Sequence, residues 1–241
     1  MNSRKSTIVF TTFKAASVFL DKVIRQAAKL TETEHHYSKV NGFPVENILL
    51  KDHSAFDGKE GYFGPFRRFI DLNKLFEKYN VVLHLRDPRD VLTSLYFSHA
   101  FSHRRGGSEG FNPGPKILAE LDKGLDDYVI FRTPEYLSYY LIYCDKLLGR
   151  DETIILRYED MVGDFRPWLV KYLSPFGIDE RSYEFKKIYN KNVKDFKVKE
   201  ENVYEHKRQV TPGDHKRKLK AETIEYLNNQ FAPVLERLGL D

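Results

Sequence analysis

Residues 81–98 read VVLHLRDPRDVLTSLYFS and join a short apolar run to the start of a helix. The run 81–85 is almost continuously apolar and rich in β-branched residues, which is typical of a strand buried on both faces in a parallel sheet. Asp87 suits the N-cap position, and Pro88 suits the first helical position, where a missing N–H costs no hydrogen bond. The stretch therefore predicts a strand that ends at Arg86 and a helix that begins directly after Asp87.

The predicted helix has an apolar stripe and a polar side. Its apolar residues recur at i, i+1, i+4 and i+5, namely Val91, Leu92, Leu95 and Tyr96. Asp90 places a negative charge in the first turn, where the helix dipole favours it. The polar side is left with Arg89, Thr93 and Ser94. An arginine at a strand end, followed by a helix start with a hydroxyl, is an arrangement with which α/β proteins bind anions.

A second junction of this kind lies near the N-terminus. Residues 7–10 predict a strand, residues 17–30 predict a helix, and the loop TTFKAA connects them. A short loop with Lys14 before a helix start is typical of phosphate binding. The loop contains no glycine and lacks the G-x-x-x-x-G-K-[ST] pattern of ATP- and GTP-binding loops. An ordinary turn with a solvated lysine is the competing interpretation.

Polar residues also follow two further predicted strands. Residues 47–50 precede Lys51 and His53, and residues 153–157 precede Tyr158. Ligands of open parallel sheets bind outside the carboxyl ends of the strands. We therefore expect Lys14, Lys51, His53 and Arg86 to converge on one edge of a sheet.

Composition supports a single folded domain. Charged residues at 31% and aromatic residues at 14% favour a globular protein over a disordered one. The length of 241 residues fits one α/β domain over residues 1–241. We expect a central, mostly parallel β-sheet flanked by helices. The single cysteine, Cys144, excludes an internal disulfide and is expected in a core helix. No apolar run is long enough for a membrane span or a signal peptide, so a cytoplasmic location is predicted.

Loops and charge distribution suggest further features. Residues 57–66 and 101–116 are rich in glycine, proline and aromatics and are predicted to be loops that cover a ligand or line an acceptor site. His99 and His103 have a spacing that can hold zinc, but no third ligand follows at a recognisable spacing, so no metal is predicted. Residues 185–220 carry twelve Lys or Arg against five Asp or Glu, which predicts an anionic ligand.

Several stretches together resemble the cytosolic type of sulfotransferase that uses 3′-phosphoadenosine 5′-phosphosulfate (PAPS). RDPRDV at 86–91 with Ser94 resembles the family's 3′-phosphate motif, R-[ND]-P-[KR]-D-V with a later serine. TFKAASVFL at 12–20 resembles the 5′-phosphosulfate loop Y-P-K-S-G-T-T-W-L, with Phe13 in place of proline and Ala16 in place of glycine. KDH at 51–53 looks like the K-T-H element, YEDM at 158–161 like Y-E-D-[LM], and HKRQVTPGDHK at 206–216 like R-K-G-x-x-G-D-W-K.

The resemblance implies a P-loop-like sulfotransferase fold and a set of site residues. His53 would be the general base, with Lys14 and Lys51 as the other catalytic residues. The donor would be PAPS, the product 3′-phosphoadenosine 5′-phosphate (PAP), and no metal would be needed. Cofactor contacts would come from Lys14, Ala15, Ala16, Ser17, Val18, Phe19, Arg86, Ser94, Tyr158 and Arg208. The acceptor would be the hydroxyl, or amine, of a small molecule, glycan or lipid, with no nucleic acid as partner.

Three alternatives remain open from the sequence. The first is a nucleotide-dependent kinase of related architecture, against which the missing Gly-Lys-Ser/Thr run argues. The second is a non-catalytic basic module that binds nucleic acid or an acidic glycan through residues 185–220. The third is an enzyme-like fold without activity. The sequence does not define the acceptor or the oligomeric state.

Overall fold

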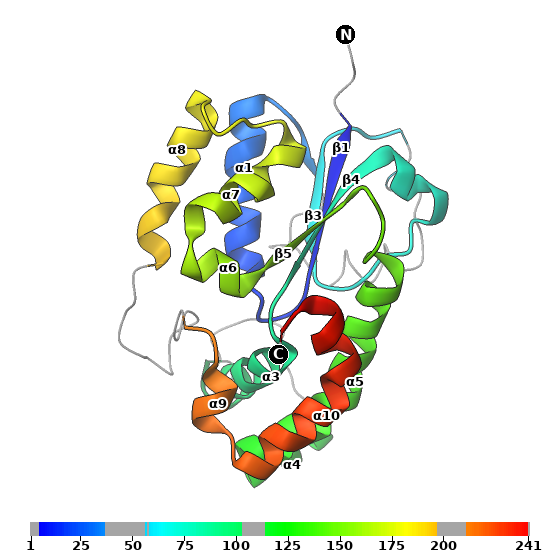
Figure 1. Ribbon diagram of the computed structural model, residues 1–241, viewed down its shortest axis with the longest axis vertical. Helices are drawn as coiled ribbons and strands as arrows, with labels where there is room; N and C mark the ends of the chain where they lie inside the picture. The colour runs from blue at the N-terminus through cyan, green and yellow to red at the C-terminus, as the bar shows by residue number, and fades with distance from the viewer. Residues whose placement is uncertain (1–4, 37–55, 57, 103–113, 197–210, 241) are drawn as a thin grey trace. The chain divides into compact units, whose positions relative to one another are not determined.

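The computed structural model describes residues 5–36, 56, 58–102, 114–196 and 211–240 (Figure 1). The chain divides into two compact units: residues 1–86 with 145–196, and residues 87–144 with 197–241. The one-domain organisation over 1–241 stays a prediction. The predicted strand 47–50 lies outside the described residues.

The first unit is built on a five-stranded parallel sheet with the strand order β2-β3-β1-β4-β5. The strands are β1 (Ser6–Thr11), β2 (His35–His36), β3 (Tyr62–Phe66), β4 (Tyr79–Leu85) and β5 (Thr153–Arg157). The strands predicted over 7–10, 81–85 and 153–157 are thereby confirmed. Because all paired strands are parallel, their carboxyl ends share one edge of the sheet.

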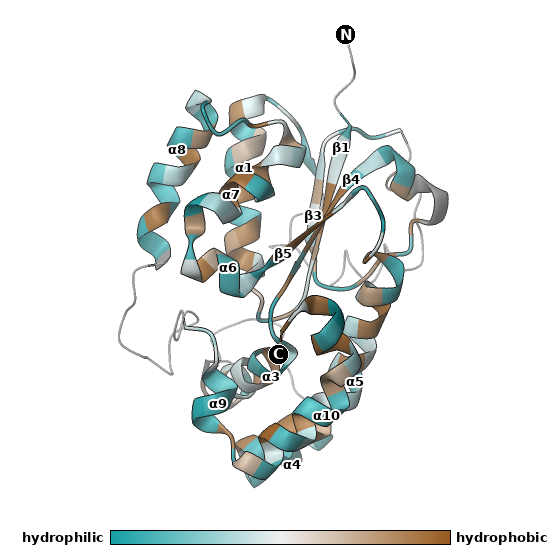
Figure 2. Cartoon of the chain, in the orientation of Figure 1, coloured by the Kyte–Doolittle hydropathy of each residue, from teal (hydrophilic) through white to brown (hydrophobic). Residues whose placement is uncertain are grey.

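Helices cover one face of this sheet, and a 3-10 helix, η3 (Asn73–Lys78), precedes β4. The helices are α1 (Ser17–Thr31), α6 (Tyr158–Gly163), α7 (Phe165–Leu173) and α8 (Tyr183–Asn192). The core between them and the strands includes Val9, Val82, Leu156 and Trp168, all buried. In Figure 2 the helices alternate between hydrophilic and hydrophobic residues, whereas much of β4 and β5 is hydrophobic. The expected central, mostly parallel sheet flanked by helices is confirmed.

One predicted loop is wrong, because residues 62–66 form the strand β3 inside the sheet. Every residue of this strand is buried, including Tyr62 and Phe63, so these rings are core and do not line an acceptor site. Glycine and proline normally predict a turn. Here Gly61 has φ 134°, and an added Cβ would lie 2.4 Å from the Glu34 carbonyl oxygen. The glycine serves the close approach of two backbones and not a loop.

The second unit is helical. It contains α3 (Pro88–Phe97), the π-helix η4 (Ser98–Ser102), α4 (Pro115–Lys123), α9 (Asp214–Lys218), α10 (Ala221–Leu238) and most of α5 (Leu125–Lys146). The helix predicted after Asp87 is confirmed, and Asp87 caps it by accepting the Arg89 N–H at 2.9 Å. Cys144 is buried in α5, as expected. None of the helices in the described part of the chain is long and apolar enough to cross a membrane.

Candidate functional site

The loop between β1 and α1 has an unusual backbone. Lys14 has φ 62° and Ala16 has φ 59°, so both adopt the left-handed conformation, which costs a residue with a Cβ about 1–2 kcal/mol. Ala16 is the N-cap of α1, and its side chain makes no capping hydrogen bond. An α-helix start has N–H groups without intrahelical partners, and these N–H groups attract anions. The loop therefore presents a helix start and a lysine side by side.

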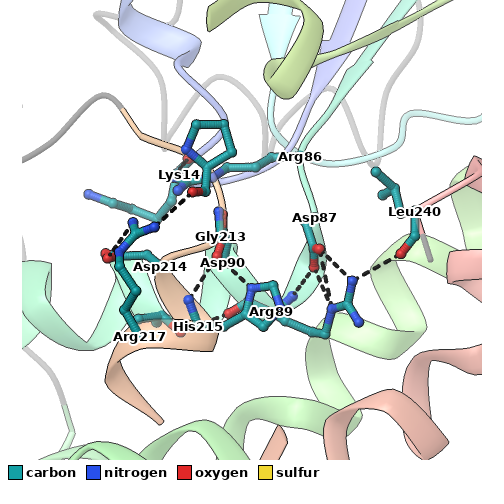
Figure 3. A network of polar contacts seen from close by, with 12 residues as sticks. Lys14, Arg86, Asp87, Arg89, Asp90, Gly213, Asp214, His215, Arg217 and Leu240 are labelled. Carbon is teal, nitrogen blue, oxygen red and sulfur yellow. Dashed lines mark hydrogen bonds and ion pairs between the residues drawn. The ribbon is translucent and has the colours of Figure 1, made fainter. Parts of the chain in front are cut away.

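Arg86 connects the end of β4 to this loop. Its side chain is buried, and its Nη1 donates a hydrogen bond to the Lys14 carbonyl oxygen at 3.2 Å (Figure 3). The guanidinium carbon also lies 4.4 Å from the centre of the Tyr158 ring, a cation–π distance. The first unit thus brings together three of the predicted site residues, Lys14, Arg86 and Tyr158. A lysine, an arginine and a helix start in this arrangement favour binding of a phosphate-like anion.

The other residues of the loop differ in exposure. Ala15 and Ser17 are buried, whereas Val18 is 47% exposed at the surface of the first helical turn. Phe19 is partly buried, and its ring centre lies 5.9 Å from that of Phe165 in an edge-to-face contact. The ring is therefore held in place by α7.

The remaining predicted site residues lie in the second unit or outside the described residues. Ser94 is partly buried on α3, in the second unit. Lys51, His53 and Arg208 lie outside the described residues. Their places in a site stay predictions.

Arg89 belongs to the polar side of the predicted helix, yet its side chain is buried. It is 5% exposed and pairs with Asp87 at 2.7 Å. It also donates to the Asn228 side chain at 2.7 Å and to the Leu240 carbonyl at 2.9 Å (Figure 3). The C-terminal segment encloses it, so Arg89 is a structural residue of the second unit. Thr93 is buried as well, and its hydroxyl donates to the Arg89 carbonyl.

Asp90 is a polar centre whose contacts the sequence did not reveal. Its carboxylate is fully buried and accepts hydrogen bonds from the Gly213 N–H at 2.7 Å, the His215 N–H at 3.0 Å and His215 Nδ1 at 2.7 Å (Figure 3). Sequence patterns identified it only as a first-turn charge. The Asp90 carboxylate thus links, through hydrogen bonds, two stretches that both resemble sulfotransferase motifs: RDPRDV at 86–91 and PGDHK at 212–216.

His84 is a second missed residue, since it lies within an apolar run. It is fully buried, and its ring meets Trp168 edge to face at 5.5 Å. Burial lowers the pKa of His84 from 6.5 to about 3, against smaller opposing effects of the Ala15 backbone and Asp160. The imidazole is therefore neutral at physiological pH.

His99, the first histidine of the pair considered for zinc, makes a hydrogen bond inside the protein. His99 is buried, and its Nδ1 shares a hydrogen bond of 2.7 Å with the Tyr128 hydroxyl. His103 lies outside the described residues. Among the described residues, no group of three or more His, Cys, Asp or Glu side chains is placed to hold a metal ion.

The profile of the sulfotransferase domain family matches residues 65–239, a range that includes the 86–94 motif and excludes the Lys14 loop. A search of curated proteins gave no match.

Solved structures give the fold over nearly the whole chain. The mouse sulfotransferase SULT7A1 complexed with PAP is 13% identical, with a TM-score of 0.65 over 96% of this chain and 84% of its own. Retinol dehydratase with androsterone and inactive cofactor PAP is 10% identical, with a TM-score of 0.59 over 98% of this chain and 82% of its own. Retinol dehydratase in a complex with retinol and PAP is 11% identical, with a TM-score of 0.57 over 98% of this chain and 83% of its own.

The family profile spans well over half of the chain, and the fold of these structures is that of the described residues. The chain belongs to the sulfotransferase domain family.

Proposed function

We propose that this protein transfers a sulfuryl group from PAPS to an acceptor hydroxyl or amine by in-line displacement. The observation that carries the proposal is the hydrogen bond from Arg86 to the Lys14 carbonyl. It joins the two stretches that resemble the family's phosphate-binding motifs at one edge of the sheet. The solved structures with this fold are complexes with PAP, which supports the same donor here.

The Lys14 loop is proposed to hold the reacting end of the donor. The N–H groups at the start of α1 and the Ser17 hydroxyl would bind the 5′-phosphate, because the helix start is favourable for negative charge. The Lys14 ammonium would neutralise the bridging oxygen as PAP leaves. Charge on the leaving oxygen grows in the transition state, so a cation there lowers the barrier.

Arg86 is proposed to bind the non-reacting end, with Ser94 and Arg208. Arginine matches the geometry of a phosphate through parallel N–H groups and keeps its charge at all relevant pH values. Tyr158, already stacked against Arg86, would lie beside the adenine, and Phe19 would contact its face. Ala15, Ala16 and Val18 would contribute backbone contacts to the phosphosulfate.

The acceptor side rests on His53 and Lys51. His53 would remove the acceptor proton, since a histidine titrates near neutrality, and Lys51 would assist at the sulfuryl oxygens. We propose a small-molecule, glycan or lipid acceptor. Retinol dehydratase with this fold has been crystallised with androsterone and with retinol, which supports a small molecule with a hydroxyl.

Calorimetric titration with PAP and with Mg²⁺–ATP tests the donor. We expect PAP to bind without a metal and Mg²⁺–ATP to bind weakly or not at all. Preference for Mg²⁺–ATP would favour a kinase. Steeply salt-dependent binding to RNA or heparin, with no binding of PAP, would favour the basic module.

Transfer of labelled sulfuryl from PAPS to a panel of hydroxyl compounds then tests the reaction. His53→Gln should keep the affinity for PAP and lose turnover by about 10²–10⁴-fold, the usual contribution of a general base. Unchanged turnover of His53→Gln would overturn the base assignment and leave the donor assignment intact.

A further inference from the structure

His84 lies directly beneath the Lys14 loop. The β1–β4 register pairs Thr11 with His84, which is the last strand pair before the loop begins. The ring is fully buried, and neither of its nitrogens has a hydrogen-bond partner among the described residues. A buried polar group without a partner costs about 1–3 kcal/mol, and an aliphatic side chain at this position would avoid that cost. A buried ring with two such nitrogens calls for a physical reason.

The surroundings of the ring show which partner is near. The Trp168 indole stands almost perpendicular to the imidazole and cannot accept a conventional hydrogen bond, since its nitrogen is only a donor. Thr11, the strand partner of His84, donates its hydroxyl to the Ala15 carbonyl, so this carbonyl lies next to the strand position that pairs with His84. The Ala15 backbone also raises the pKa of the ring, as an acceptor near the imidazole would. The ring and this carbonyl form no hydrogen bond in the structure.

The Ala15 carbonyl accepts one long hydrogen bond from a side chain. Its described side-chain contact is with the Thr11 hydroxyl at 3.4 Å, at the long end of hydrogen-bonding distances. Ala15 lies between two left-handed residues, Lys14 and Ala16, so this backbone is held against its own preference.

We propose that His84 is a positioning residue for the donor loop: in the donor-bound protein its ring N–H binds the Ala15 carbonyl and fixes the backbone that holds the 5′-phosphate. This inference rests on the proposed function, because it assigns the loop to the 5′-phosphate of PAPS. A neutral imidazole suits the task, since it donates one hydrogen bond without adding a charge. His84 is fully buried in the sheet, so its effect would act through the loop.

Two substitutions and one control separate positioning from packing. His84→Leu removes the donor and should weaken PAP binding about tenfold in calorimetry, the effect of one lost hydrogen bond, while the unliganded protein becomes no less stable. His84→Gln keeps an N–H donor and should recover part of the affinity. Leu156→Val changes the neighbouring buried position of β5, the register partner of His84, and should lower stability without changing PAP affinity.

The wild-type protein gives an independent readout. Nitrogen-15 spectra of the His84 ring should show one nitrogen becoming a hydrogen-bonded N–H when PAP is added. Unchanged PAP affinity in His84→Leu, or ring signals that PAP does not move, would overturn the positioning role. If wild type binds no PAP, the proposed function fails together with this inference. If wild type binds PAP and Arg86→Ala does not, the proposed function stands, and the His84 variants alone decide this inference.

Discussion

The Arg86 guanidinium donates to the Lys14 carbonyl at 3.2 Å, across 72 positions of the sequence. This bond explains how a loop without glycine keeps a left-handed residue at Lys14, because it fixes the direction in which that carbonyl points. The same arginine therefore shapes the loop for one end of the proposed donor and carries charge for the other. Loss of Arg86 should affect both ends.

Ala16→Gly should stabilise the first unit. The left-handed φ of 59° strains alanine, and glycine relieves this strain. Part of the gain is offset because glycine gives the unfolded chain more conformational freedom. We expect the free energy of unfolding to rise by about 0.5–1 kcal/mol. Urea denaturation followed by the fluorescence of Trp168, the only tryptophan, measures it.

The matched control for this change is Ala28→Gly in the same helix. Ala28 is buried in α1 with ordinary helical surroundings, and glycine there should lower the free energy of unfolding by about 1 kcal/mol. If both substitutions destabilise the protein equally, the left-handed strain at Ala16 is not real.

Asp90→Ala should strongly destabilise the second unit. The substitution removes a buried acceptor and leaves two N–H groups and His215 Nδ1 without it, so we expect a loss of about 3–5 kcal/mol. Urea denaturation followed by circular dichroism measures the loss. Asp160→Ala, which removes an exposed pair with Arg157, should cost about 1 kcal/mol or less. Comparable losses in the two variants would contradict the structural role of Asp90.

Stability should fall in acid because of His84. The pKa of His84 is about 3 in the folded protein and 6.5 in the unfolded chain. As the pH falls from 6.5 towards 3, the unfolded chain therefore binds a proton at this histidine and the folded protein does not, which favours unfolding. The free energy of unfolding should therefore drop by about 2 kcal/mol between pH 7 and pH 5 from this residue. Between the same two pH values, the free energy of unfolding of His84→Leu should fall by about 2 kcal/mol less than that of wild type. Urea titrations at each pH measure both losses. An identical acid loss in both proteins would show that His84 is not buried in its neutral form.

The strands that the sequence predicted are those with local signals. Residues 81–85 and 153–157 are mostly apolar and rich in β-branched side chains, and Asp87 followed by Pro88 marks the start of a helix. The strand β3 was missed because its signal is tertiary. Gly64 has φ 94°, and a Cβ there would lie 2.5 Å from the Val9 carbonyl, so the residue is glycine because two strands meet. Sequence pattern alone gives such a glycine the appearance of a turn.

The residues of the candidate site also fall into those with a local sequence signal and those without one. Lys14, Arg86 and Tyr158 were predicted from their positions at strand ends, and parallel pairing necessarily gathers such ends at one edge. The burial of Arg89 could not be predicted, because it depends on Asn228 and Leu240, which follow it by more than a hundred positions. No local pattern carries that information.

Recognition of the donor's 3′-phosphate by Arg86 is the central claim, and the affinities of PAP and adenosine 5′-phosphate test it most directly. Wild type should prefer PAP, and Arg86→Ala should reduce that preference by about 2–3 kcal/mol, the value of a charged hydrogen-bond partner. Arg166→Ala, which removes an exposed arginine paired with Glu180, should leave the preference unchanged. Full preference for PAP in Arg86→Ala would contradict the account.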